Sequence, residues 1–451
     1  MEEEKLVEKK TRRDGIDDDA DELAGIGFWW AKLPKELQYK VLSRLSLREL
    51  FQVRCVCPEF RAVVHLQEFA SLYDEVHKSD PPTPVKCLLQ SPPPRSPVGL
   101  LMFDYARAVW KEVTTLGGEA YPTGRIYMNE GGHHAFAVGG LVCFHYKGDD
   151  VRAWVVWNPL TGKWKTLPPS KYDAGIGAIA FMHAFEAGDE SPSKSYKILV
   201  AHAPREVIND DLSGRIHFGG DRDGSLVTEI YDSATGSWTD PAPEHVFQPP
   251  MISFNANSFG DPVLCDGVIY FTASKRMRAD HNFTGLVDQK VLLCYDIKSH
   301  EWHEQETDNH CGSIFEWDGR VMAVIPAQLH GGGDCFVWID FRTTALYEVC
   351  CWDPASKRWV NTGVHIPDRI MENFDDRITE NFSVDLGSLA KWVAAGDYLV
   401  GTGICPLYKD GIWTAVYNKQ ENNWRYVEDV SISTRPFRQL LQYKPRLDLV
   451  P

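Results

Sequence analysis

One spacing recurs six times along this chain of 451 residues. In each copy an aromatic residue is followed by Asp or Asn, then by five further residues, and then by Trp. The copies are Phe103-Asp104 to Trp110, Trp157-Asn158 to Trp164, Tyr231-Asp232 to Trp238, Tyr295-Asp296 to Trp302, Trp352-Asp353 to Trp359 and Tyr417-Asn418 to Trp424. A unit that recurs at intervals of roughly 50–75 residues indicates a repeat architecture.

Each copy predicts a β-hairpin. An apolar run precedes the aromatic residue, as in residues 153–156 and 291–294, which is typical of a buried strand. The Asp or Asn predicts a tight turn, because its side chain bonds the backbone two residues further on. The Trp then begins the returning strand, and we expect its side chain to be buried against a neighbouring unit. The alternative is an unrelated set of hairpins in a β-sandwich.

A second signal precedes most copies. Four short turn sequences each come directly before an apolar stretch: Gly139-Gly140, Asp266-Gly267, Asp318-Gly319 and Gly396-Asp397. With one more strand before these turns, each unit has the four strands of a propeller blade. The turn, the aromatic residue and the spaced Trp together resemble kelch repeats. The expected fold class is therefore mainly β, a six-bladed kelch-type β-propeller over residues 85–447, preceded by a small all-α module.

The first repeat lacks one strand. Residues 85–89 and 100–103 supply only two strands ahead of the strand that contains Trp110. Pairing strands from both ends of the chain in one blade removes exposed strand edges. We therefore expect residues 437–446 to pair in the first blade.

The chain ahead of the repeats has three parts. Residues 1–27 are highly charged and predict a disordered tail, within which residues 9–13 are either a nuclear signal or a solvated charge run. Residues 28–78 have helical apolar spacing, and the last of them, residues 66–78, predict a linking helix. Residues 79–84 predict a proline-rich linker.

Three short helices are predicted ahead of the linking helix. Leu33-Pro34 opens the first, where a first-turn proline is tolerated. Ser46 and Glu49 have the spacing of a capping box at the start of the second. Pro58 opens the third. Because so few residues can bury only a little surface, we expect this module to depend on a partner for part of its stability.

Residues 30–65 resemble an F-box in the order and spacing of their Leu, Pro and Val residues, although Phe60 stands where Trp is usual. An F-box followed by a kelch propeller resembles a large plant family of substrate adaptors. The resemblance implies that this module docks on a Skp-family linker protein, and through it on a cullin. The docking residues we expect are Leu33, Pro34, Leu37, Val41, Leu45, Leu50, Val53, Val56, Cys57 and Phe60. The alternative is a helical cap on the propeller.

Composition narrows the function. The net charge is −16, which argues against nucleic acid as the primary ligand. The 11 cysteines are scattered and include no Cys-x-x-Cys, which favours a reducing compartment, the cytoplasm, the nucleus or both. No apolar run has the length of a membrane helix, and the charged start of the chain predicts no signal peptide. His133-His134 has no convincing third ligand, so we expect no metal and no cofactor.

No catalytic motif is present, so we expect a non-catalytic adaptor of a ubiquitin ligase whose propeller binds an unidentified protein substrate. Long connections are predicted at residues 204–224, 274–289, 328–334 and 363–381, and binding usually resides in such loops. Their basic residues favour an acidic or polar partner: Arg205, Arg215, Arg222, Lys275, Arg276 and Arg278. The alternatives are a regulatory scaffold such as a transcriptional cofactor and, third, a glycan-binding or enzymatic propeller.

Overall fold

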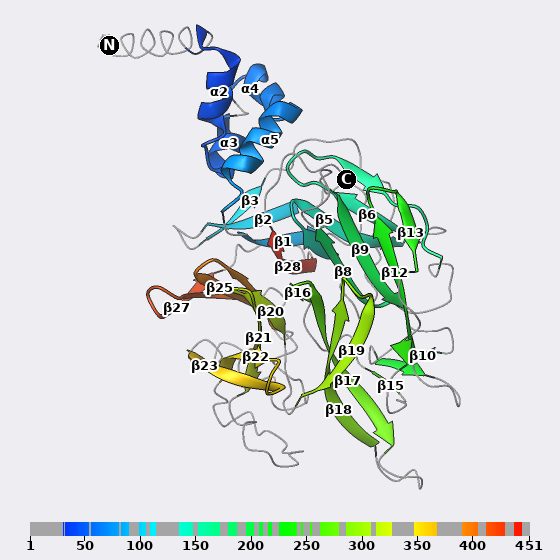
Figure 1. Ribbon diagram of the computed structural model, residues 1–451. Coiled ribbons are helices and arrows are strands. Elements are labelled where there is room, and N and C mark those ends of the chain that lie inside the picture. The colour runs from blue at the N-terminus through cyan, green and yellow to red at the C-terminus, as the bar shows by residue number, and fades with distance from the viewer. Residues whose placement is uncertain are drawn as a thin grey trace, which may run out of the picture. The chain divides into compact units, whose positions relative to one another are not determined.

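In the computed structural model the chain divides into two compact units, Met1–Ser79 and Asp80–Pro451. Figure 1 shows helices in the first unit and strands in the second. The predicted tail, residues 1–27, lies outside the described residues. The residues that the structure describes are 30, 32–53, 56–80, 83–89, 99–104, 109–113, 135–147, 152–171, 179–186, 195–202, 207–210, 215–218, 225–240, 245–246, 253–254, 262–278, 286–307, 313–326, 347–367, 390–404, 412–428 and 437–443.

The first unit contains the helices that the sequence predicts. They are α2 (Lys35–Leu42), α3 (Leu47–Val53), α4 (Pro58–Val63) and α5 (Gln67–Val76). The capping box at α3 is confirmed, since the Ser46 N–H donates to Glu49 Oε2 at 2.8 Å. In return, the Glu49 N–H donates to Ser46 Oγ at 3.4 Å, so the box satisfies two backbone donors at the start of α3.

The core of the helical unit is centred on α5. Phe69 and Tyr73 on this helix are 0% and 2% exposed. Tyr39 on α2 packs edge-on against Phe69, with ring centroids 5.9 Å apart. The His77 ring, just after α5, bonds the Ser43 carbonyl after α2 at 2.9 Å. The helix predicted as a link therefore supplies much of the core that holds α2 in place.

Within the described residues, the strands of the second unit form six antiparallel sheets. The first contains β28 (Phe437–Tyr443), β1 (Thr83–Leu89), β2 (Gly99–Asp104) and β3 (Val109–Val113). The second contains β4 (Ala135–Val138), β5 (Leu141–Lys147), β6 (Arg152–Trp157) and β7 (Trp164–Thr166). The third contains β8 (Ile179–Glu186), β9 (Tyr196–His202), β12 (Ser225–Asp232), β13 (Ser237–Thr239) and β14 (His245–Val246).

The remaining three sheets follow along the chain. The fourth contains β16 (Val263–Cys265), β17 (Val268–Arg278), β18 (Leu286–Asp296) and β19 (Glu301–Glu306), together with β10 (Val207–Asp210), β11 (Arg215–Phe218) and β15 (Ser253–Phe254). The fifth contains β20 (Ile314–Trp317), β21 (Arg320–Pro326), β22 (Tyr347–Asp353) and β23 (Arg358–Ile366). The sixth contains β24 (Ala390–Ala395), β25 (Tyr398–Ile404), β26 (Ile412–Asn418) and β27 (Asn423–Glu428).

Neighbouring sheets pack through their first strands. β4 contacts both β8 and β28, β24 contacts both β28 and β20, and β20 contacts β16. The third and fourth sheets are joined by a hydrogen bond of 2.9 Å from Trp302 Nε1 to Thr228 Oγ1. Buried clusters shared by adjacent sheets fill the space between them. The second unit is therefore a mainly-β propeller, and the small helical unit precedes it in the sequence.

Strands from the two ends of the second unit pair as the sequence predicts. β28 runs antiparallel to β1, from Thr83 opposite Tyr443 to Leu89 opposite Phe437. Residues 444–446 of the predicted range lie outside the described residues. The linker prediction was too long, because residues 83 and 84 belong to β1. The pairing with β28 explains this: it continues the ladder through a proline that local sequence alone would place in a linker.

The recurring spacing gives the same cross-strand pair in every copy. The aromatic residue lies directly opposite the Trp in the pairs Phe103–Trp110, Trp157–Trp164, Tyr231–Trp238, Tyr295–Trp302, Trp352–Trp359 and Tyr417–Trp424. In the Tyr295 copy the ring centroids are 5.0 Å apart. Adjacent aromatic side chains of this kind stabilise an antiparallel pair. The hairpin prediction is confirmed.

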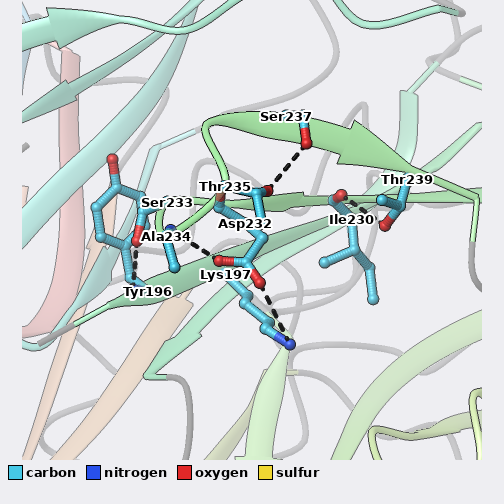
Figure 2. A network of polar contacts seen from close by, with 9 residues as sticks. All are labelled: Tyr196, Lys197, Ile230, Asp232, Ser233, Ala234, Thr235, Ser237 and Thr239. Carbon is cyan, nitrogen blue, oxygen red and sulfur yellow. Dashed lines mark hydrogen bonds and ion pairs between the residues drawn. The ribbon is translucent and has the colours of Figure 1, made fainter. Parts of the chain in front are cut away.

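The turns also form as expected. Asp232 Oδ1 accepts a hydrogen bond from the Ala234 N–H at 2.8 Å, and Figure 2 shows this turn with its neighbours. Lys197 on the adjacent strand β9 lies 3.7 Å from the other oxygen of the Asp232 carboxylate. The same bond to the backbone two residues on is made by Asn158, Asp296, Asp353 and Asn418. The turn of the first copy, residues 105–108, lies outside the described residues.

The second signal marks two-residue turns between the first and second strands. The residues that flank these turns are paired as Val138–Leu141, Cys265–Val268, Trp317–Arg320 and Ala395–Tyr398. Asp266 and Gly267 both have positive φ, 49° and 76°, which suits a tight hairpin between twisted strands. The turn sequences seen before the apolar stretches therefore join paired strands within one sheet.

Candidate interaction surfaces

An apolar surface lies open on the helical unit. Leu33, Leu37 and Val41 are 37%, 46% and 50% exposed, although apolar residues of a small core would normally be buried. Leu37 and Val41 are four residues apart on α2, so they share one face of the helix. Val56, between α3 and α4, is 71% exposed. We refer to Leu33, Leu37, Val41 and Val56 as the apolar surface of the helical unit.

The segment ahead of α2 is held by a side chain that sequence reasoning missed. Gln38 Nε2 donates to the carbonyl oxygens of Trp30 and Leu33, at 3.0 and 2.9 Å. The Leu33 N–H also donates to the Trp30 carbonyl, at 3.1 Å. Trp30 packs edge-on against Phe60, with ring centroids 5.3 Å apart. These contacts fix the position of Leu33, and an isolated Gln on an exposed helix carries no signal for such a role.

The ten expected docking residues divide by burial. The exposed ones are Leu33, Pro34, Leu37, Val41 and Val56. The half-buried ones are Leu45, Val53, Cys57 and Phe60. Leu50 is 2% exposed and therefore belongs to the core of the helical unit. The structure thus separates the residues that are free to contact a partner from the one that holds the helices together.

The expected basic loop residues have different positions. Arg205 and Arg222 lie outside the described residues. Arg215 lies in β11, and Lys275, Arg276 and Arg278 lie in β17, so their assignment to loops was wrong. β17 and β18 pair over 11 residues each, from Val268 opposite Asp296 to Arg278 opposite Leu286. A run of basic residues can form a strand when neighbouring strands provide the backbone hydrogen bonds.

Two other predicted loops contain strands as well. Residues 207–210 and 215–218 of the connection at 204–224 form the hairpin β10–β11. The first residues of the connection at 363–381 belong to β23, which ends at Ile366. The connection at 328–334 lies outside the described residues.

Strands from one connection extend the neighbouring sheet. β10 and β11 come from the connection between β9 and β12 of the third sheet. They join the fourth sheet in the order β10-β11-β15-β17, where β15 pairs with the outer part of β17. Figure 1 shows β10, β15, β17 and β18 at the same end of the second unit. We call β10, β11, β15 and the paired residues 274–278 and 286–290 the extension sheet.

A buried polar cluster lies in the third sheet. Glu229 is 1% exposed and accepts hydrogen bonds from the Ser170 hydroxyl and, at 3.1 Å, from the Lys171 N–H. His202 Nε2 lies 3.2 Å from the same carboxylate. A pocket of about 370 Å³ adjoins the cluster, lined among others by Trp238. Both Glu229 oxygens are engaged, so the carboxylate anchors the segment after β7 to β12.

The sequence signal for this cluster is weak. Glu229 interrupts an apolar strand, and one charged residue within a strand has many ordinary explanations. Trp238 Nε1 donates to the Pro168 carbonyl at 2.8 Å, which joins the second and third sheets beside the cluster. This bond confirms that a repeat Trp packs against the neighbouring unit.

The remaining features concern metals and membranes. Among the described residues, no three His, Cys, Asp or Glu side chains lie together in a way that could hold a metal ion. Four described thiols of the propeller, those of Cys143, Cys265, Cys294 and Cys350, are buried, and burial raises the pKa of Cys265 to about 11 and that of Cys350 to about 12. In the described part of the chain, every helix is too short or too polar to cross a membrane.

Comparison with known proteins locates two domains. Residues 30–71 match the F-box domain, and residues 130–311 match the F-box associated beta propeller domain. An F-box protein of Arabidopsis thaliana is 25% identical over 183 residues, which cover 38% of this chain and 41% of the relative. F-box only protein 6 of Arabidopsis thaliana is 23% identical over 277 residues, 61% of this chain and 47% of the relative.

The kelch resemblance receives less support. An F-box/kelch-repeat protein of Arabidopsis thaliana is 24% identical over 212 residues, 46% of this chain and 49% of the relative. The domain that matches the strands is nevertheless the F-box associated propeller and not a kelch repeat. The chain spans less than half the length of each of these three relatives.

Solved structures add little. A Trypanosoma rangeli sialidase aligns with a TM-score of 0.39 and 11% identity over 73% of this chain and 50% of that chain, a likeness too low to carry an argument about chemistry. Residues 30–71 therefore form an F-box domain, residues 130–311 carry an F-box associated β-propeller domain, and the relatives described above are plant F-box proteins.

Proposed function

We propose that this protein is the substrate-recognition subunit of an SCF-type ubiquitin ligase, in which a Skp-family linker joins it to a cullin. The observation that carries the proposal is the apolar surface of the helical unit, which lies within the residues that match an F-box domain. Exposed apolar residues grouped on one small module mark an interaction site. The F-box is a domain for which docking on a linker protein is the expected use.

The energetics of the apolar surface favour such docking. Full burial of a Leu or Val side chain contributes about 1.5–3 kcal/mol. Leu37 and Val41 are half-exposed, so each has about 1 kcal/mol still to contribute when a partner covers it. Gln38 and Trp30 hold Leu33 in place before binding, which lowers the entropy that docking must overcome.

The propeller supplies the second binding function. We propose that the six sheets are the six blades of one closed ring. This is supported by contacts between five pairs of first strands, by the Trp302–Thr228 hydrogen bond between the third and fourth sheets, and by the pairing of β28 with β1. A closed ring is a rigid base for target-binding elements. The receptor itself makes and breaks no bond; it holds the target near the ubiquitin-transfer machinery and so raises its effective concentration.

Docking is tested by measuring the affinity of the full chain for a purified Skp-family linker. We expect Leu37→Ala with Val41→Ala to weaken binding by about 2 kcal/mol, or roughly 30-fold. The matched control is Val360→Ala on β23, because Val360 has the same 50% exposure as Val41 but lies in the propeller. The Leu33→Ala, Pro34→Ala double variant is expected to weaken binding as well.

Equal affinity of the wild type and the Leu37→Ala, Val41→Ala variant would contradict docking through α2. Delivery to degradation is tested separately, by the half-life of co-purifying proteins after depletion of this chain. Unchanged half-lives, with linker binding intact, would favour a regulatory scaffold.

A further inference from the structure

We propose that the pocket beside Trp238 binds an arginine side chain of the target protein. This inference rests on the proposed function, since it names a chemical group of the target that the propeller holds. The pocket has a volume of about 370 Å³, and ligand pockets typically measure roughly 300–1,000 Å³. A space at the lower end of that range suits a single side chain.

Two segments of chain supply the described lining of this pocket. One is the segment after β7 of the second sheet, which includes residues 168–169, both Pro, and Lys171. The other is the hairpin of β12 and β13 in the third sheet, which includes Glu229, Trp238 and Asp240. The pocket therefore combines an aromatic ring and two prolines with two carboxylates.

The register directs the ring and both carboxylates to the same side of the third sheet. Trp238 lies directly opposite Tyr231, and Glu229 precedes Tyr231 by two residues on β12. Asp240 follows Trp238 by two residues. Alternate residues of a strand share a face, so the three side chains point the same way. That face is the one toward the second sheet, because the Trp154 ring of β6 lies 6.4 Å from the Trp238 ring.

The charges of the lining favour a cation. The Lys171 N–H donates to Glu229 Oε1 at 3.1 Å, and Lys171 Nζ donates to Asp240 Oδ2 at 2.7 Å. Glu229 is 1% exposed, whereas the side chains of Asp240 and Lys171 are 37% and 63% exposed. Two acids and one base give the described lining a formal charge of −1. An ion pair as exposed as Lys171–Asp240 is weak, so a cationic ligand can replace Lys171 at Asp240.

The propeller holds a cation in a similar way between its fifth and sixth sheets. There Lys419 Nζ donates to Asp318 Oδ2 at 2.5 Å and lies 5.6 Å from the centroid of the Trp317 ring. The Trp317 indole N–H donates to a carbonyl of the neighbouring sheet at 2.9 Å, as that of Trp238 does at 2.8 Å. An indole fixed in this way beside a carboxylate attracts a cation through both the ring and the charge.

Arginine suits the pocket better than lysine. Trp238 is half-buried and lines the pocket, so a planar guanidinium can stack on its ring. The same guanidinium can present two N–H groups to the Asp240 carboxylate, which an ammonium cannot do in that geometry. The apolar stem of the side chain would lie along the two prolines.

The strand that carries the ring is held in place before a ligand binds. Ser237 Oγ lies 2.9 Å from Thr235 Oγ1, and the Thr239 hydroxyl donates to the Ile230 carbonyl at 3.3 Å (Figure 2). These bonds fix β13 against β12 on either side of Trp238. A wall that is already ordered lowers the entropy that binding must overcome.

The test is a titration of the full-length protein with an end-capped Gly-Arg-Gly peptide, followed through the NMR signals of the Trp indole N–H groups. The Trp238 signal is identified by its loss in Trp238→Phe. We expect this signal to shift, with a dissociation constant on the order of 1 mM. The same peptide with citrulline, which resembles arginine but is uncharged, should bind at least about tenfold more weakly. A lysine peptide should bind about threefold more weakly.

Substitutions at the two Lys–Asp pairs locate the site. Asp240→Asn should weaken binding about fivefold, because the guanidinium loses its charged acceptor. The matched control is Asp318→Asn, the same change in the other exposed pair, for which less than about a twofold change is expected. Lys171→Gln should tighten binding about threefold, since it removes the ammonium that competes for Asp240, and Lys419→Gln should not.

Four results would overturn the inference. The first is an unchanged Trp238 signal at about 10 mM peptide. The second is equal binding of the citrulline or lysine peptide. The third is an equal loss with Asp318→Asn, which would indicate attraction by overall charge. The fourth is binding of free arginine at least about tenfold tighter than the capped peptide, which would indicate a site for the amino acid itself. Melting curves confirm that each variant is folded, and Asp240→Ser replaces Asp240→Asn if that fails to fold.

Linker affinity, measured on the same variants, separates this inference from the proposed function. If the linker binds and the arginine peptide does not, only the pocket inference fails. If the peptide binds and the linker does not, the proposed ligase role fails while the pocket stands as an arginine site.

Discussion

The helical unit and the propeller differ in how many of their large apolar side chains are exposed to solvent. Among the described residues, eight large apolar side chains are exposed, and six of them lie in the helical unit although it is far the smaller of the two. Among the propeller residues whose exposure the structure describes, the large apolar side chains that are exposed are Val360 and Tyr426. The described propeller core therefore buries most of its large apolar side chains, whereas the core of the helical unit leaves several of its own exposed, where the proposed linker would cover them.

The difference comes from how each region gains its contacts. The propeller repeats one hairpin, and three copies bury their aromatic pair against the sheet that precedes them in the chain: Tyr231–Trp238, Trp352–Trp359 and Tyr417–Trp424. The helical unit has no second copy of itself to pack on, and its core depends on α5 and a few residues such as Leu42 and Leu50. Under the proposals above, the propeller is stabilised by closure of its ring and the helical unit by association with a linker protein. Each of the following changes tests this contrast.

The largest effect is expected from removing β28. A chain that ends after residue 434 leaves the edge of β1 without its seven-residue partner strand and exposes the packing site of Leu440, which is 1% exposed. Loss of that side chain alone costs about 2 kcal/mol, and the lost ladder adds to it. We expect calorimetry to show a propeller melting temperature lower by about 10 °C or more.

The control for this truncation is a chain that ends after Tyr443, which retains the whole of β28. It should melt like the full chain and bind the linker equally well. If the shorter chain also melts normally, the ring does not depend on closure, and the contrast with the helical unit fails.

The next effect is expected at Leu50. Replacement of a buried Leu by Ala costs about 2–5 kcal/mol, which is a large share of the stability of so small a helical unit. Leu50→Ala should therefore abolish linker binding, while the propeller transition stays where it is. Leu37→Ala is the matched control for stability: Leu37 is 46% exposed, so its replacement should change the free energy of unfolding by less than about 0.5 kcal/mol and should weaken linker binding without abolishing it. If the Leu50→Ala variant still bound the linker, the fold of the helical unit would not depend on the burial of Leu50.

A smaller effect is expected at Gly401 in β25. A Cβ there would collide with the indole of Trp392, which lies directly opposite on β24. We expect Gly401→Ala to lower propeller stability by about 1–3 kcal/mol in denaturant unfolding. Trp392→Leu in the same chain should recover part of that loss. No change in stability would mean that the sheet shifts freely, contrary to a ring whose parts constrain one another.

Gly236→Ala serves as the comparison for that substitution. Gly236 has open space around its would-be Cβ but a φ of +68°, so only backbone strain opposes the change. That strain costs about 1–2 kcal/mol. If the collision with Trp392 causes the loss of stability, adding Trp392→Leu should restore part of the stability of the Gly401→Ala variant and should not improve that of the Gly236→Ala variant.

The smallest effects are expected from two side chains that accept hydrogen bonds from backbone N–H groups. Ser46→Ala removes the cap of α3, and Asp232→Ala removes the turn bond of β12 (Figure 2). Each should cost about 1 kcal/mol. For the propeller this is a fall of about 2–4 °C in melting temperature and nothing more. For the helical unit we expect Ser46→Ala to cause a measurable loss of linker affinity. If both substitutions lowered only the melting temperature, and by equal amounts, the proposed difference between the two regions would be contradicted.

Local sequence was sufficient where local geometry decides the structure. The turn between the aromatic residue and the Trp has a constant length, so the pairs Tyr231–Trp238 and Tyr417–Trp424 follow from spacing alone. The capping box at Ser46 follows for the same reason. Even the pairing of β28 with β1 could be predicted, because counting strands leaves one missing.

Other features depend on contacts between distant residues. The long strands β17 and β18 reach residues 278 and 286, and β15 pairs along one side of β17. β15 in turn pairs with the hairpin β10–β11, which comes from the connection between β9 and β12 of the third sheet. A local reading sees only a basic, turn-like stretch at Lys275–Arg278. Likewise, the helical spacing of Leu37, Val41 and Leu50 can be read from the sequence, but not that Leu50 is buried while Leu37 and Val41 are exposed.

The pairing of β28 with β1 also affects the order in which parts of the chain can fold during synthesis. β1 ends at Leu89 and its partner begins at Phe437, so the 347 residues between them must be synthesised before β28 can begin to complete the first sheet. At 5–20 residues per second this takes roughly 20–70 s. The helical unit precedes β1 and can fold during that interval. Under the proposed function, a newly made chain can thus bind the linker while one edge of its propeller is still open, and for that period the open edge is a site for unwanted strand pairing.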